Sequence, residues 1–342
     1  MNIIFYNLSH IGDTFIVQPL IKQFCEANSD YNISVYTQYN WGIYKEIPNL
    51  KIINEEIQNY LYNLNENHIP EHIINYSDNN KQILNMLKHR DSQLDFLIND
   101  NFLYINTWYA TWPDFLSETI LNPIYLHVTF YKIINYINSK YNLSLKFIIP
   151  EIITPPILPY VDLTDFISYK NNNIDKRFIF YYNLYPRSGQ SLPVSNHESI
   201  IEQLALKHKN SIIIIPIQIN KKYDNVICTA ELFNCMQVPS CDNVIKNVNI
   251  AMLCDYVISY DIGACLYHYN SKLNETFKGI WYHIGKPESS QYYNSIYLND
   301  DHNRLYINEN YKTLYTNDNK IKQILLNNND EINNFLLENI TI

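Results

Sequence analysis

Short apolar runs alternate with polar or helix-like segments along most of this chain, and this alternation limits its fold more than any other feature. Strands that alternate with helices predict βαβ units, because a crossover connection must separate two parallel strands. We therefore expect an α/β fold on parallel sheets. The strand-like runs are Asn2–Tyr6, Ile33–Thr37, Lys51–Asn54, Leu94–Ile98, Arg177–Tyr182, Ser211–Ile217, Asp255–Ser259 and Gly279–Ile284.

The chain of 342 residues is longer than one compact core usually needs. A proline cluster in its middle is followed by a polar run, Lys170–Asn173, which marks a boundary. We expect a Rossmann-like N-terminal domain over 1–160, a linker over 161–176 and a Rossmann-like C-terminal domain over 177–342. Apolar residues at roughly helical spacing predict a closing helix within Asn319–Glu338. The clustered prolines are Pro150, Pro155, Pro156 and Pro159.

Charge and composition exclude several classes of protein. The net charge is −9 and no long basic run is present, so no surface for tracking nucleic-acid phosphates is expected. The sequence shows neither a signal peptide nor an apolar run of membrane-spanning length, which predicts a cytoplasmic protein, in the host cytoplasm if the chain is viral. Peripheral membrane contact and the oligomeric state stay open. The six cysteines form no Cys-x-x-Cys pair, which favours reduced, buried thiols over a metal site.

The first strand runs directly into a loop with chemistry-bearing residues. Gly12 allows a tight turn or the close approach of a ligand, and Asp13 can cap the next helix or accept a proton from a hydroxyl group. Pro19 predicts an irregular or kinked start to that helix. Taken alone, the Gly-Asp pair favours the helix cap. The loop residues that could contact an acceptor are His10, Gly12 and Thr14.

Two loops in the second half follow strands in the same way. After the strand at Asp255–Ser259 come Asp261, Ile262 and Gly263, where a helix start would offer free backbone N–H groups to a ribose or an anion. An ordinary capped βα turn explains this pattern equally well. After the strand at Arg177–Tyr182, a guanidinium suited to phosphate precedes a glycine, although an exposed arginine is the simpler interpretation. The residues of this second loop are Arg187, Ser188, Gly189 and Gln190.

Together these loops resemble glycosyltransferase family 9, the heptosyltransferases of GT-B fold. Those proteins open with a strand, a loop ending in Gly-Asp and an apolar helix containing a proline, as Ile11–Leu20 does here. Later they carry a strand followed by Asp-Ser/Thr-Gly, which Asp255–Gly263 is similar to. The resemblance implies two Rossmann-like α/β/α domains that face each other across a cleft.

The resemblance also implies a function, namely inverting transfer of a sugar from a nucleotide-diphosphate donor to a glycan or another hydroxyl acceptor. Asp13 would be the general base. The second-domain loops, with Arg187 as the cation, would hold the donor, and no cofactor or metal is expected.

Departures from the family pattern keep other functions open. Ile262 replaces a serine or threonine, Gln190 replaces a lysine, and the nearest histidine, His268, lies two residues too far on. These changes suit a GT-B-like binding or scaffold protein without catalysis. A nucleotide-sugar epimerase of similar shape would need another carboxylate, for which Glu198 and Glu231 are candidates. A dehydrogenase is disfavoured, because neither half has Gly-x-Gly-x-x-Gly after its first strand.

Overall fold

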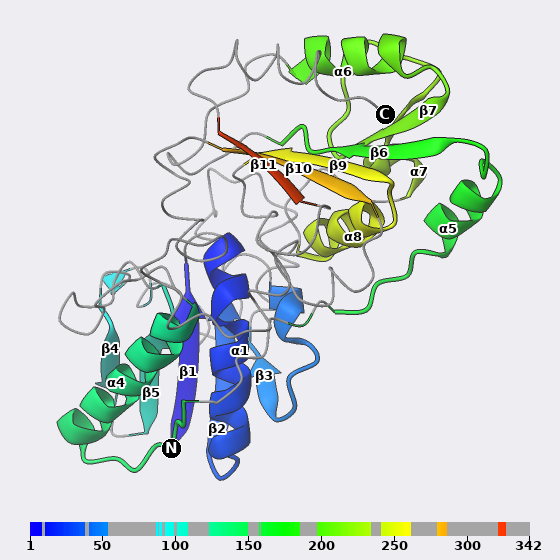
Figure 1. The fold of residues 1–342 in the computed structure, drawn as a ribbon. Coiled ribbons are helices and arrows are strands. Elements are labelled where there is room, and N and C mark those ends of the chain that lie inside the picture. The colour runs from blue at the N-terminus through cyan, green and yellow to red at the C-terminus, as the bar shows by residue number, and fades with distance from the viewer. Residues whose placement is uncertain are drawn as a thin grey trace. The chain divides into compact units, whose positions relative to one another are not determined.

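The structure is a computed structural model, and it describes residues 1–8, 11–37, 41–53, 87, 89–90, 93–98, 101–108, 123–149, 157, 159–184, 197–233, 241–260, 279–285 and 321–325. The chain divides into two compact units, Met1–Pro159 and Tyr160–Ile342. Each unit contains one sheet with helices packed on it (Figure 1). The α/β class that the alternation predicted is confirmed in both.

Unit 1 is built on a five-stranded sheet in the order β3-β2-β1-β5-β4. Strands β2 and β5 run parallel to β1 on its two sides, and β3 runs parallel to β2. The expectation of parallel strands fails at β4, which is antiparallel to β5. Only three residues separate these two strands, too few for the crossover that a parallel pair requires. The bounds are β1 Asn2–Asn7, β2 Asn32–Thr37, β3 Leu50–Ile52, β4 Asp95–Ile98 and β5 Phe102–Asn106.

The two faces of this sheet carry alternate residues of β1. Phe5 meets Phe24 of helix α1 (Ile11–Ala27) edge to face, with ring centroids 5.0 Å apart. It also meets Phe130 of helix α4 (Pro123–Tyr141), at 6.1 Å. On the opposite face Tyr6 packs with Phe96, in a buried cluster formed largely by aromatic and aliphatic side chains. Both α1 and α4 therefore cover the Phe5 face.

Helix α1 is continuous from Ile11 to Ala27 with Pro19 inside it, where we expected an irregular start. Amide side chains along it bind the backbone of the segment after α4. Asn28 donates to the carbonyl of Lys146 at 2.7 Å and accepts from its N–H at 2.8 Å. Gln18 makes the same pair of bonds with Ile157, at 2.9 and 2.7 Å. The amides satisfy these partly buried backbone groups and hold the segment on the helix.

Unit 2 contains a six-stranded sheet in the order β11-β10-β9-β6-β7-β8, and all five of its strand pairs are parallel. Helices lie on both faces, as in a doubly wound fold. Phe166 of α5 packs edge to face on Phe178 of β6, while His197 of α6 contacts Tyr181, whose side chain leaves β6 on the other face. The bounds are α5 Thr164–Asn171, β6 Arg177–Tyr181, α6 His197–Lys207, β7 Ser211–Ile215, β8 Val226–Cys228, α7 Thr229–Leu232, α8 Cys241–Met252, β9 Tyr256–Tyr260, β10 Ile280–Gly285 and β11 Ile321–Leu325.

Two segments differ from their sequence-based expectation. The range 161–176, expected to be a linker, contains α5, whose Phe166 is fully buried. The prediction of a closing helix within Asn319–Glu338 is wrong for Ile321–Leu325, because these residues form the strand β11. This run extends the sheet by pairing with β10, and its isoleucines favour the pleated conformation. Residues 326–342 lie outside the described part of the chain.

Candidate active site

The strand order of unit 2 places two of the predicted loops beside each other. From β6 the chain proceeds to β7 and β8 on one side, and from β9 to β10 and β11 on the other. The order therefore reverses between β6 and β9, and ligands of open parallel sheets bind at the carboxyl ends of strands where this happens. The loop with Arg187 follows β6 and the loop with Asp261 follows β9, so the two candidate donor loops start from neighbouring strands at this reversal.

These donor-loop residues themselves lie outside the described part of the chain. That applies to Arg187, Ser188, Gly189 and Gln190 after β6, and to Asp261, Ile262 and Gly263 after β9. What the structure describes is the base from which each loop leaves the sheet.

Unit 1 has a corresponding reversal between β1 and β5, and the Gly-Asp pair lies beside it. The helix after β1 begins at Ile11, so Gly12 and Asp13 are its second and third residues. The N-cap position precedes Ile11, which means that Asp13 is not the N-cap that the simpler interpretation required. His10 lies outside the described residues.

Thr14, the remaining acceptor-side candidate, is fully buried in the first turn and a half of α1. Its backbone carbonyl accepts a hydrogen bond of 2.9 Å from the hydroxyl group of Tyr44. Tyr44 belongs to η1 (Trp41–Tyr44), the short helix after β2, and burial raises its pKa. This contact ties the start of α1 to η1.

Buried polar side chains gather at the carboxyl edge of the unit 1 sheet. Asn7 and Thr37 are paired in register at the ends of β1 and β2, Asn106 ends β5, and Thr107 directly follows it. All four are fully buried. Thr107 donates its hydroxyl to the carbonyl of Tyr6 at 3.1 Å, and its N–H donates to the same oxygen at 2.9 Å. The carboxyl edge of the unit 1 sheet is therefore polar, and a hydrogen bond from Thr107 to β1 links its strands there.

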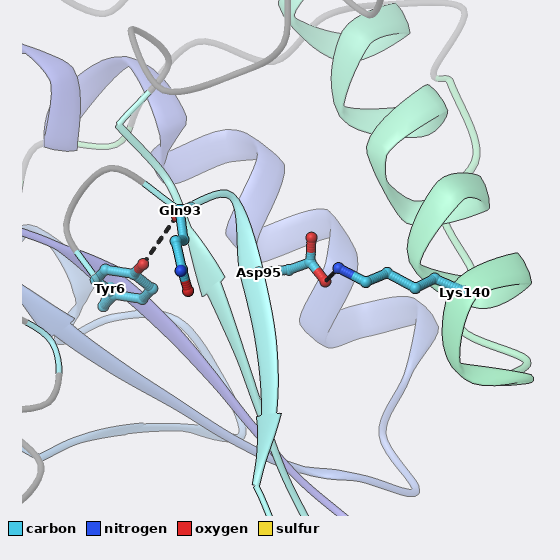
Figure 2. Close-up of polar contacts among 4 residues, drawn as sticks. All are labelled: Tyr6, Gln93, Asp95 and Lys140. Atoms are coloured by element: carbon cyan, nitrogen blue, oxygen red, sulfur yellow. Dashed lines mark hydrogen bonds and ion pairs between the residues drawn. The ribbon is translucent and has the colours of Figure 1, made fainter. Parts of the chain in front are cut away.

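A second set of polar contacts fixes β4 and the segment before it. The hydroxyl of Tyr6 lies 2.9 Å from the carbonyl oxygens of both Arg90 and Gln93. Figure 2 shows the contact between Tyr6 and Gln93 together with Lys140, which reaches across from α4 to the buried carboxylate of Asp95 at 3.0 Å. Burial alone would lower the pKa of Lys140, but its bonds to Asp95 and Tyr141 outweigh burial and raise it. We interpret these contacts as structural, because each one satisfies a polar group inside unit 1.

In unit 2 three buried aromatic side chains meet at the ends of the elements from which the candidate donor loops leave. The hydroxyl of Tyr181 lies 2.8 Å from Nδ1 of His197 and 2.8 Å from the hydroxyl of Tyr260. Burial lowers the pKa of His197 from 6.5 to about 4, so the ring is neutral at pH 7. Sequence patterns do not predict this cluster, because the two tyrosines are 79 residues apart and are brought together only by the pairing of β6 with β9.

The ends of the loop after β6 are fixed by further bonds that we did not foresee. The side-chain amide of Asn183 donates to the carbonyl of Ile217 at 2.6 Å and accepts from its N–H at 2.9 Å. At the other end, Glu198 accepts 3.0 and 2.9 Å bonds from the backbone and side chain of Asn220. The carboxylate considered for an epimerase thus holds a neighbouring loop, and the structure gives it a supporting role.

The structure describes the side chains of three of the six cysteines, Cys25, Cys228 and Cys254, and all three are free and buried. Burial raises the pKa of Cys25 to about 12, which makes it a poor nucleophile. Within the described ranges, no group of three or more His, Cys, Asp or Glu side chains could hold a metal ion. None of the described helices is long and apolar enough to cross a membrane.

No protein-family model matches the sequence, and no curated protein sequence matches it. Several solved structures are similar. One is a family 9 glycosyl transferase from Veillonella parvula DSM 2008, at 11% identity and a TM-score of 0.43 over 99% of this chain and 90% of that one. Another is ADP-heptose LPS heptosyltransferase II of E. coli, at 12% identity and a TM-score of 0.41 over 100% of both chains.

A third similar structure is the E. coli heptosyltransferase WaaC with ADP, at 11% identity and a TM-score of 0.35, covering 84% of this chain and 88% of that one. The chain is thus similar in structure to proteins of the group that its motifs resemble. Because the TM-scores are all below 0.5, we assign no function from them and rely on the residues of this chain.

Proposed function

We propose that this protein is a glycosyltransferase that moves a sugar from a nucleotide-diphosphate donor to a hydroxyl acceptor. One observation carries the proposal, the position of the candidate loops in the topology. Each sequence motif that was ambiguous alone follows a strand at the point where the strand order of a largely parallel sheet reverses. Helix caps without a function would have no reason to gather at these points, whereas ligand-binding loops do.

The proposed roles follow from the chemistry of each group. Asp13 takes the proton of the acceptor hydroxyl as its oxygen forms a bond with the anomeric carbon of the donor. The bond from that carbon to the diphosphate oxygen breaks, and the nucleoside diphosphate leaves with the electron pair. Arg187 and the backbone around Gly189 and Gly263 would stabilise the charge that develops on it. Attack from the face opposite the leaving group inverts the anomeric centre, and no metal is required.

Binding of the nucleotide is the first test. A thermal-shift panel of nucleoside diphosphates and nucleotide-sugars, including nucleotide-heptoses and nucleotide-hexoses, should raise the melting temperature with at least one member. At a ligand concentration of a hundred times Kd, the expected stabilisation is about 2.7 kcal/mol. If no member of the panel shifts the transition, the proposed donor class is wrong.

Catalysis is tested with the donor found in that panel. Asp13→Asn should lower the rate of transfer, or of donor hydrolysis in the absence of acceptor, by about 10²- to 10⁴-fold, because a general base contributes that much. Glu26→Gln, a change at an exposed carboxylate near the other end of α1, is the matched control and should leave the rate unchanged.

Three results would redirect the proposal. Full activity in Asp13→Asn means that another group is the base. Donor binding without any turnover in the unmodified protein favours the scaffold function that Ile262 and Gln190 suggested. Conversion of the donor sugar to its epimer without an acceptor favours the epimerase.

A further inference from the structure

Tyr181, His197 and Tyr260 are each the terminal residue of an element at the edge where the donor loops begin. Tyr181 ends β6, His197 begins α6, and Tyr260 ends β9. The chain between Tyr181 and His197 carries Arg187, and Asp261 directly follows Tyr260. Their exposed fractions are 0%, 4% and 1%, so all three lie below the surface that a ligand would touch.

The hydroxyl of Tyr181 joins the other two residues. Its oxygen is 2.8 Å from Nδ1 of His197 and 2.8 Å from the hydroxyl oxygen of Tyr260. The three rings also contact one another edge to face, with centroids 5.7 to 6.0 Å apart. Edge-to-face packing together with two hydrogen bonds gives the cluster a single defined arrangement.

Burial keeps His197 neutral, and a neutral imidazole has one donor nitrogen and one acceptor nitrogen. With Nδ1 as the acceptor, Tyr181 donates to His197 and Tyr260 donates to Tyr181. With Nδ1 protonated, His197 donates to Tyr181 and Tyr181 donates to Tyr260. In both arrangements the Tyr181 hydroxyl is the shared node that links β9 and α6 through β6.

We propose that the Tyr181 hydroxyl is a positioning group, which sets the spacing between the two loop bases and thereby the affinity of the site for a nucleoside diphosphate. This inference rests on the proposed function. Asn183 supports it independently, since its amide fixes the other side of the β6 loop base to Ile217 with bonds of 2.6 and 2.9 Å. Fixed attachment points lower the entropic cost of binding, so losing one anchor weakens binding.

The test is Tyr181→Phe, which keeps the ring and removes the hydroxyl. The nucleoside diphosphate found in the thermal-shift panel should bind about ten-fold more weakly to this variant, as expected for the loss of a buried hydrogen-bonded node. Tyr6→Phe is the matched control. Tyr6 is also fully buried, and its hydroxyl also serves two partners, but it lies in unit 1. Its variant should lose stability and keep the affinity.

Hydrogen exchange of the ligand-free protein gives a second measurement that does not depend on binding. Tyr181→Phe should speed exchange both in peptides that begin at Asn183 and in peptides that begin at Tyr260. Tyr260→Phe leaves the bond between Tyr181 and His197 intact, so it should speed exchange only in the second set. A merely structural loss would instead lower protection throughout unit 2.

The outcomes separate this inference from the proposed function. If the unmodified protein binds no nucleoside diphosphate, the proposed function fails and the inferred role in affinity fails with it. If the unmodified protein binds one and Tyr181→Phe binds it equally well, the positioning role is overturned while the proposed function stands. Equal weakening in Tyr181→Phe and Tyr6→Phe also overturns it.

Discussion

His197 couples the stability of unit 2 to pH. Its ring packs against Tyr181 and Tyr260, while the adjacent Glu198 is occupied by Asn220. Burial lowers the pKa of His197 from 6.5 to about 4 in the folded protein. Between these values the unfolded chain binds a proton that the folded chain does not. The contribution to stability is therefore fully present above pH 6.5 and is lost as the pH falls toward 4.

Replacing His197 by asparagine should remove this dependence. Between pH 7 and pH 5, the unfolding free energy of unit 2 should fall by about 2 kcal/mol more in the unmodified protein than in His197→Asn. Urea unfolding at the two pH values measures the difference. Tyr181→Phe keeps the buried ring and should retain the dependence. Identical pH profiles for the unmodified protein and His197→Asn would contradict this, because they would mean that His197 binds its proton equally well in the folded and unfolded states.

At the scale of single residues, the sequence singles out candidate ligand-binding positions but not the residues that support them. Asp13 and Asp261 stay predictions, made because an acidic residue next to or near a glycine after a strand has a recognisable chemistry. Tyr181 and Tyr260 carry no such signal in a chain with 31 tyrosines. Their partnership depends on which strands become neighbours, and local sequence does not encode strand order.

Gly279, at the start of β10, is required by the approach of two strands. A Cβ atom at this position would lie 2.2 Å from the backbone carbonyl oxygen of Asp255, well inside contact distance. The same oxygen accepts the N–H of Ile280 at 2.9 Å, which begins the pairing of β10 with β9. Gly279→Ala should therefore force the two strands apart and destabilise unit 2 by about 1–3 kcal/mol.

Chemical unfolding of Gly279→Ala measures this cost, and Lys176→Ala is a suitable control. Lys176 is exposed immediately before β6 of the same sheet, where substitution should change stability by less than about 0.5 kcal/mol. If Gly279→Ala matched the control, the approach of β10 to Asp255 would have to be looser than described.

Strands that are determined by local sequence were predicted well, and those that depend on pairing with distant segments were not. The runs Asn2–Tyr6 and Ile33–Thr37 became β1 and β2 nearly as expected. The direction of β4 and the strand β11 were not anticipated. Whether β4 and β5 form an antiparallel pair depends on the short connection between them. Whether a five-residue run such as Ile321–Leu325 forms a strand depends on pairing with a sheet edge, here β10.

Among the described residues of the molecule, each unit has a buried core of its own. Ile134 of α4 is 1% exposed and packs in unit 1, while Ile213 of β7 is 0% exposed and packs in unit 2. A chain whose units have their own cores is expected to unfold in units, since truncation of one core removes contacts only from the elements around it.

Truncation of each isoleucine tests this expectation directly. Ile134→Ala and Ile213→Ala should each cost about 2–5 kcal/mol, because both leave a cavity in a close-packed interior. Native-state hydrogen exchange resolves where the loss falls. Ile134→Ala should lower protection in β1 and β2 while β6 and β9 keep theirs, and Ile213→Ala should give the reverse. Equal losses everywhere from either variant would mean that the chain unfolds as one cooperative unit, and that a ligand held by one unit stabilises both.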